Sequence, residues 1–203
     1  MKTPSNFECH NLDNTHTFCT GRLPDSLVLN SDQFDALWQM HPPELHLIKI
    51  HGRLVHTPRW QQAYGMDYYY TGRVNKALPI PPLLNPLVNW AKENIDERLN
   101  GILVNFYDGK LDHKIGPHHD SIKNMVSYTP IVTISFGEGR IFRLRPAGDC
   151  KHATPVDFQA SNGAVFIMPF ETNLAFKHEV PSSKRLCGRR ISVTLRALNE
   201  PAA

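Results

Sequence analysis

Residues 189–198 read RRISVTLRAL, and apolar and polar side chains alternate along them. Because successive side chains of a β-strand point to opposite faces of a sheet, this alternation predicts a strand with two chemically different faces. One face carries only aliphatic side chains and suits a core. The other face carries two arginines and two hydroxyl groups, from Arg190, Ser192, Thr194 and Arg196.

The polar face of this strand has two interpretations. Arginines on an edge strand are commonly plain surface residues. Arginine also binds a carboxylate through two parallel hydrogen bonds, and neighbouring hydroxyl groups can add further ones. Two arginines on one side of a strand therefore also suit a receptor for a dicarboxylate.

Four more short segments after residue 101 are rich in Val, Ile, Phe and Thr, with Gly, Pro or Asn between them. They are ILVNFY (102–107), PIVTISFG (130–137), RIFRLRP (140–146) and GAVFIMP (163–169). Several short strands at close spacing indicate a sandwich or jelly-roll rather than alternating strands and helices. We therefore expect a β core over about residues 101–198.

The first hundred residues have a different character. Residues 1–30 look irregular and polar, and LHLIKIHG (45–52) predicts a strand. Ser31 is expected to cap a short helix, and Pro86 suits the first turn of a second helix that ends near Gly101. With 203 residues, the chain is expected to be one domain in which the helices of about residues 1–100 flank the β core.

Composition narrows the classes of protein. Hydrophobic residues make up 41% of the chain and charged residues 20%, which is typical of a globular protein and not of a disordered one. No apolar run is long enough for a membrane span, and the N-terminus lacks a signal core, so a cytoplasmic or nuclear location is expected rather than secretion. The net charge of +3 permits an anionic partner without demanding one. Nothing indicates an obligate protein partner.

The four cysteines show no CxxC spacing. We therefore expect free thiols in a reducing compartment and no cysteine-based zinc site.

A His-x-Asp pattern lies in the segment IGPHHDS (115–121). On an extended chain His118 and Asp120 share a face, whereas His119 points away. A third ligand would come from elsewhere, with His178 the best candidate and His152 the competitor. Two histidines and one carboxylate on one side of an iron ion form the facial triad of Fe(II) oxygenases. Because the chain holds eleven histidines, the pattern taken alone is also consistent with chance.

The strand expected just before this pattern has a polar face of its own. Asn105 and Tyr107 point to one side of it and can line the same cavity as the metal. A tyrosine buried in the core is the alternative interpretation of Tyr107.

Taken in order, these motifs resemble those of the AlkB family of Fe(II)/2-oxoglutarate-dependent dioxygenases, over roughly residues 50–198. The matching segments are NFYDG, HHD, TPIVTISFG, RIFRLR, KHEVP and RRISVTLR. The resemblance implies a mainly β fold with flanking helices (α+β), with a double-stranded β-helix (jelly-roll) core and an N-terminal substrate lid. It implies Fe(2+), 2-oxoglutarate and O2 as cofactor and cosubstrates. By position, the iron ligands would be His118, Asp120 and His178, and the 2-oxoglutarate ligands Asn105, Tyr107, Arg190 and Arg196.

The segment PRWQQAYGMDYYYTG (58–72) is similar to the nucleotide-recognition lid of that family. The similarity implies that Arg59 and either Gln62 or Gln61 shape the lid. Tyr68 and Tyr70 would lie beside the substrate, with Tyr70 stacking on a flipped base. The ordinary alternative is that the tyrosines form a sheet surface.

The resemblance implies oxidative demethylation of N-alkylated bases in DNA or RNA, single-stranded or flipped, with release of formaldehyde, succinate and CO2. The chain departs from the family pattern just after Asp120, where DNA-repair members commonly carry acidic or polar residues that contact the flipped base. Ile122 cannot accept a hydrogen bond from the exocyclic amine of an alkylated adenine or cytosine. The same chemistry on a protein side chain or small molecule is a first alternative. A catalytically silent binding module is a second, disfavoured by the presence of all three ligands and both arginines.

Overall fold

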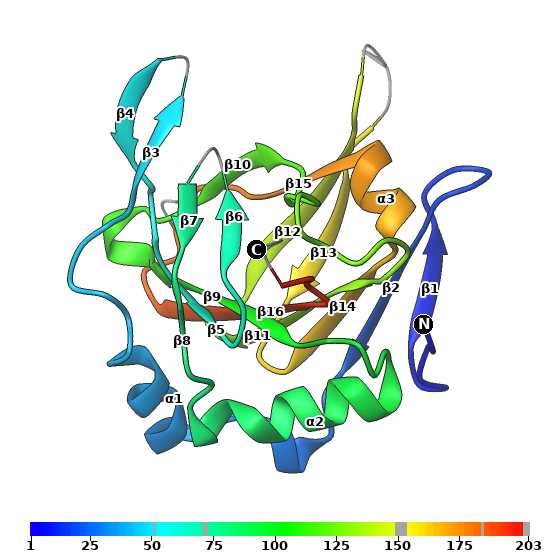
Figure 1. The fold of residues 1–203 in the computed structure, drawn as a ribbon, viewed down its shortest axis with the longest axis horizontal. Coiled ribbons are helices and arrows are strands. Elements are labelled where there is room, and N and C mark those ends of the chain that lie inside the picture. The colour runs from blue at the N-terminus through cyan, green and yellow to red at the C-terminus, as the bar shows by residue number, and fades with distance from the viewer. Residues whose placement is uncertain (51, 71–72, 149–153, 184, 201–203) are drawn as a thin grey trace.

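The computed structural model describes residues 1–50, 52–70, 73–148, 154–183 and 185–200 and shows a larger and a smaller sheet together with two separate two-stranded hairpins (Figure 1). Apart from the parallel pair β5 and β8, the strands in both sheets run antiparallel to their neighbours. The larger sheet has eight strands, in the order β1 (Glu8–Asn11), β2 (Thr17–Arg22), β14 (Ala164–Met168), β11 (Ile131–Gly137), β16 (Arg189–Arg196), β9 (Gly101–Asp108), β5 (Trp60–Tyr64) and β8 (Ala77–Leu78). The smaller sheet has four, in the order β10 (Ile115–His118), β15 (Phe176–Val180), β12 (Arg140–Pro146) and β13 (Val156–Ala160). The expected mainly β fold is confirmed.

The two largest hydrophobic cores lie on opposite faces of the larger sheet. On one face the helices α1 (Ser31–Trp38) and α2 (Asn85–Asn94) pack against it, with Leu37 and Leu87 buried on the aliphatic side of β16. On the other face the smaller sheet covers it, and Phe166 of β14 meets Phe142 of β12. A third helix, α3 (Phe170–Ala175), connects β14 to β15. The polar side of β16 thus faces the space between the two sheets.

Two hairpins rise beside this space (Figure 1). They are β3 (Leu47–Ile50) with β4 (Arg53–His56), and β6 (Tyr68–Tyr70) with β7 (Arg73–Asn75). Short 3-10 helices, Asp25–Leu27, Pro82–Leu84 and Gly109–Leu111, complete the described elements. None of the helices in the described ranges is long and apolar enough to cross a membrane.

The N-terminal end of α1 differs from the expectation. Asn30, not Ser31, is the capping residue: its side chain accepts a hydrogen bond from the Gln33 backbone N–H at 2.9 Å. The Gln33 side chain in turn accepts from the Asn30 backbone N–H at 3.0 Å, which completes a capping box. Pro86 lies in the first turn of α2 as expected.

The expectation of an irregular segment over residues 1–30 is wrong. β1 and β2 form a hairpin, and β2 pairs with β14 from Ala164 to Ile167. Little hydrophobic alternation marks these strands in the sequence, because their pairing with β14 is a tertiary contact that local patterns do not record.

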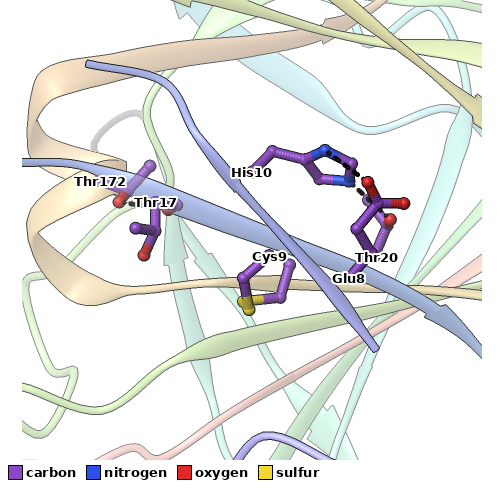
Figure 2. The surroundings of a disulfide bond; sticks show 7 residues. Glu8, Cys9, His10, Thr17, Thr20 and Thr172 are labelled. Atoms are coloured by element: carbon purple, nitrogen blue, oxygen red, sulfur yellow. Dashed lines mark hydrogen bonds and ion pairs between the residues drawn. A yellow bond between two sulfur atoms is a disulfide. The ribbon is translucent and has the colours of Figure 1, made fainter. Parts of the chain in front are cut away.

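The hairpin also places Cys9 directly opposite Cys19, with 4.0 Å between their Cα atoms, and the two form a disulfide (Figure 2). The expectation of free thiols is therefore wrong for this pair, which adjacent antiparallel strands bring within bonding distance. Cys187 is free and exposed, and Cys150 lies outside the described residues.

Reducing the Cys9–Cys19 disulfide is expected to lower the free energy of unfolding by at most about 3 kcal/mol, because the bond closes a short loop in the unfolded chain. The two cysteines are separated by 10 positions. Thermal melts with and without dithiothreitol measure this effect as a fall of several degrees. Cys187→Ser serves as the control and should respond to the reductant like the unmodified protein. An equal response of Cys9→Ser, which has no such bond to lose, would contradict the prediction.

Candidate active site

Three side chains that can bind a metal converge between the sheets. His118 ends β10 and His178 lies directly opposite it on β15, so that the two rings are 4.2 Å apart between centroids. Asp120 follows β10 by two residues, and its Oδ1 lies 3.8 Å from the Nε2 atom of each histidine. One ligand atom from each residue lies within 4.8 Å of the others. This arrangement can hold one ion.

A local hydrogen bond prepares His118 for binding a metal. His118 Nδ1 hydrogen-bonds to the Gly116 carbonyl at 2.9 Å, which leaves Nε2 unprotonated and directed at the cluster. His178 Nδ1 is buried with no hydrogen-bond partner in the described part of the chain. Two imidazoles and one carboxylate are a donor set that suits Fe(II). The residues therefore fit a divalent iron ion.

Protonation states agree with this fit. Burial, reinforced by the nearby His178, lowers the pKa of His118 to about 3, and burial also lowers the pKa of His178. Burial opposes ionisation of Asp120, but Arg196 and the two histidines outweigh it and hold its pKa well below the usual range. At neutral pH the site thus holds neutral imidazoles and an ionised carboxylate, the forms that bind metals.

Asp120 is fixed from several sides. Its backbone N–H donates to the Asn173 side chain at 2.9 Å, and the Asn173 side-chain amide donates back to its carbonyl oxygen at 3.0 Å. Arg196 donates to Oδ2, and the Tyr68 hydroxyl donates to Oδ1 at 3.4 Å. Arg196 therefore occupies one carboxylate oxygen and leaves Oδ1 on the side of the histidines.

Arg190 and Arg196, the two arginines on the polar face of β16, differ in their hydrogen-bond partners. Arg196 is engaged with Asp120, whereas Arg190 uses only its Nε, which donates to Ser135 Oγ at 2.9 Å. Both Nη atoms of Arg190 are buried with no partner among the described residues, and its guanidinium lies 5.0 Å from the centre of the Tyr107 ring. Burial lowers the pKa of Arg190. A buried cation with two unused donor groups is suited to a carboxylate ligand.

A pocket joins the three metal-binding residues to these arginines. It is lined by all four residues of the polar face of β16, together with Asn105, Tyr107, Thr133, Tyr68, Tyr70, Arg59 and Gln61. The face assignments made for β9 and β16 from alternation are thus confirmed.

The residues expected from the lid segment divide into two groups. Arg59 and Gln61 are buried in the pocket, and Tyr70 lies edge-on to His118 with 6.3 Å between ring centroids. Gln62 does not reach the pocket, because β5 turns it to the other side, where it donates to the backbone of Ala63 and Lys76. Of the two glutamines, the structure brings only Gln61 to the site.

Three other expectations concern residues outside the cluster. His119 turns away from the metal-binding residues and contacts the Asn173 carbonyl. His152, the competing ligand, lies outside the described residues. Ile122 is 41% exposed just beyond Asp120.

Two supporting residues, Ser135 and Asn173, are not among those predicted from the sequence. Ser135 contacts Arg190 and lies on β11, where the alternation of side chains over residues 131–136 could have placed it on the pocket face, as it did for the polar residues of β16. Asn173, on the short helix α3, holds Asp120 through a contact across 53 positions that no local pattern predicts.

Comparisons with known proteins agree with this geometry. A family model described as the 2OG-Fe(II) oxygenase superfamily matches residues 25–196. The DNA oxidative demethylase ALKBH2 of Mus musculus is 29% identical over 160 residues, which are 74% of this chain and 66% of that protein. The alpha-ketoglutarate-dependent dioxygenase alkB homolog 3 of Rattus norvegicus is 29% identical over 150 residues, which are 70% of this chain and 50% of that protein. The matched part of the chain spans between half and about two thirds of the length of these relatives.

Two solved structures share the fold. The structure of OsALKBH1 superimposes with a TM-score of 0.57 at 16% identity, covering 93% of this chain and 99% of the other. A crystal structure of an oxidoreductase of the 2OG-Fe(II) oxygenase family from Burkholderia pseudomallei gives a TM-score of 0.53 at 18% identity, covering 89% and 86%. At these identities the likeness concerns the fold alone.

Proposed function

We propose that this chain, which belongs to the 2OG-Fe(II) oxygenase superfamily and is an AlkB-type member of it, oxidatively demethylates N-alkylated nucleobases in DNA or RNA. Fe(II), with 2-oxoglutarate and O2, supplies the oxidation of the methyl C–H bond to a hydroxymethyl group, while 2-oxoglutarate becomes succinate and CO2. The hydroxymethyl amine then loses formaldehyde and leaves an N–H group on the base.

The observation that carries the proposal is one pocket that holds a metal-binding triad, a partly exposed aromatic ring and a buried arginine whose two Nη groups have no partner among the described residues. His118, Asp120 and His178 hold Fe(II). Arg190 binds the distal carboxylate of 2-oxoglutarate through its two unused Nη groups, and the Tyr107 ring covers its guanidinium. Arg196 orients Asp120.

Asn105 completes the cosubstrate end of the pocket. Its Oδ1 accepts from Arg59 Nε at 2.8 Å, which leaves its amide nitrogen, unpaired among the described residues, to donate to a ligand oxygen. The neighbouring hydroxyl groups of Thr133, Ser192 and Thr194 line the same space and offer further donors.

The substrate enters from the side of the two hairpins. Tyr70 is partly exposed and stands next to His118, where its ring can stack on a base taken out of a helix or presented by a single strand. Arg59 and Gln61, buried beside it, supply polar contacts. Nucleic acid is therefore the proposed partner, and an intracellular place of action is proposed with it.

Spectroscopy and product analysis test this proposal together. Anaerobic addition of Fe(II) and 2-oxoglutarate should produce a weak visible charge-transfer band, and admission of air should produce succinate. Methylated oligonucleotides should raise the succinate yield and release formaldehyde, whereas the same oligonucleotides without methyl groups should not. Succinate without loss of methyl from any oligonucleotide would point to a protein or small-molecule substrate. Absence of both the band and succinate from folded protein would point to a binding module.

A further inference from the structure

A row of hydrogen-bonded polar side chains leads from the cosubstrate end of the pocket toward the hairpins. Arg59 Nη2 donates to Gln61 Oε1 at 3.2 Å, and Gln61 Nε2 donates to Asn75 Oδ1 at 3.4 Å. Asn105 forms the inner end through its contact with Arg59. All four side chains are buried, and Asn75 is 7% exposed at the outer end of the row.

The direction of every hydrogen bond in this row is set by Arg59. A guanidinium only donates, so Gln61 must turn its oxygen toward Arg59 and its amide nitrogen toward Asn75. Asn75 must then offer its oxygen to Gln61, which leaves its amide nitrogen, Nδ2, as the outermost group. No described residue accepts a hydrogen bond from Nδ2. Among the described residues, the row therefore ends in a donor with an unused hydrogen.

Asn75 also lines a second cavity, next to the metal pocket. The cavity measures about 210 Å³ and is lined by residues of β3, β5, β6 and β7. Gln61 and Tyr70 line both spaces, so a base stacked on Tyr70 would lie next to the cavity that Asn75 lines.

Asn75 is held firmly in this place. It pairs with Tyr68 across the β6–β7 hairpin, whose base is closed by Asp67. The Asp67 carboxylate accepts from the Ala77 backbone N–H at 2.8 Å and from Lys76 Nζ at 2.7 Å. A fixed donor discriminates between ligands better than a mobile one, because it cannot turn to suit the wrong group.

The charges and polar groups around both cavities favour a base that presents acceptors. Among the described residues that line the two cavities, only Asp120 carries a carboxylate, and Arg196 already binds it. The side chain of Ile122, two residues beyond Asp120, has no acceptor for an exocyclic amine, and this residue lines neither cavity. N1-methyladenine is cationic and carries an amino group beside its methylated nitrogen. N3-methylthymine and N3-methyluracil are neutral, and a carbonyl oxygen lies on each side of their methylated nitrogen.

We infer that Asn75 is a specificity-determining residue, which donates a hydrogen bond to a carbonyl oxygen of the base and so favours N3-methylated thymine or uracil over N1-methyladenine. This inference rests on the proposed function and names the base class that the site selects. Loss of the donor leaves a buried carbonyl unpaired, which costs about tenfold in relative affinity.

Binding to metal-free protein tests the inference without catalysis. Two fluorescein-labelled single strands of the same sequence carry one N3-methylthymine or one N1-methyladenine, and fluorescence anisotropy gives a Kd for each. The unmodified protein should bind the N3-methylthymine strand about tenfold more tightly. Asn75→Asp keeps the shape and the acceptor for Gln61 but removes the donor, so this preference should vanish or reverse. Asn75→Ala, which removes the donor without adding charge, should also lose the preference.

Asn89→Asp is the matched control, because Asn89 is exposed on α2 and the charge change is the same. It should retain the preference, and near-ultraviolet circular dichroism verifies that each variant is folded. Equal binding of both strands by the unmodified protein, or an unchanged preference in Asn75→Asp, overturns the inference.

Formaldehyde assays with the iron-loaded protein distinguish a wrong role for Asn75 from a wrong proposed function. Demethylation of both strands at equal rates overturns the role of Asn75 and leaves the proposed function intact. Succinate formation with no demethylation of either strand overturns both.

Discussion

Replacing His178 with alanine is expected to lower iron-dependent succinate formation by more than roughly a hundredfold, because even groups that merely support a metal ligand commonly account for 10- to 100-fold effects. His178 faces His118 directly across β10 and β15, and its Nε2 lies 3.8 Å from Asp120 Oδ1. Without it, only His118 and Asp120 remain to hold the ion. Bound iron per chain and succinate per chain, measured on the same sample, record the loss.

His119→Ala is the matched control for this experiment. His119 is adjacent to His118 in sequence but contacts the Asn173 carbonyl outside the cluster. It should keep its iron, and its activity should remain close to that of the unmodified protein. Retention of iron and activity by His178→Ala would show that another residue completes the site, and the assignment of the third ligand would then be wrong.

Replacing Arg190 with methionine is expected to raise the 2-oxoglutarate concentration needed for half-maximal turnover on the order of a hundredfold, equivalent to about 3 kcal/mol. Methionine keeps much of the side-chain length but loses both Nη groups, which have no described partner in the protein. Iron binding should stay intact, since Arg190 donates to Ser135 and not to a metal-binding residue. Titration of the visible charge-transfer band with 2-oxoglutarate gives the affinity independently of turnover.

Two further variants make this result specific. Arg189→Met removes the neighbouring arginine, which pairs with Asp35 on the surface, and should leave the 2-oxoglutarate requirement unchanged. Arg196→Met removes the partner of Asp120 and should lower iron affinity as well as 2-oxoglutarate affinity. The roles given to the two arginines would be reversed if Arg196→Met lowered only the 2-oxoglutarate affinity, and lowered it more than Arg190→Met does.

The parts of the site that local alternation governs were predictable from the sequence. In β16 and β9, side chains two positions apart must share a face, so the polar rows of Arg190 to Arg196 and of Asn105 to Tyr107 followed from strand periodicity alone. The same argument paired His118 with Asp120 and separated His119 from them. His178 was a choice between candidates on the sequence, and the register of β10 with β15 is what brings it opposite His118.

Features that depend on contacts between distant segments were not predictable. β1 and β2 exist because β14 pairs with β2, and that hairpin is what joins Cys9 to Cys19. The choice of Gln61 over Gln62 depends on which face of β5 meets the pocket, and neither glutamine differs locally from the other. Asn75 belongs to the site only because the β6–β7 hairpin folds back beside β5.

The most direct test of the central claim is the mass of a methylated oligonucleotide after incubation with the protein, Fe(II), 2-oxoglutarate and air. Oxidative demethylation predicts that the oligonucleotide loses the mass of one CH2 group, and that formaldehyde and succinate form in equal amounts. His178→Ala should leave the mass unchanged. If the mass of every N-methylated oligonucleotide stays unchanged while the protein converts 2-oxoglutarate to succinate, nucleobases are not its substrates and the account is contradicted.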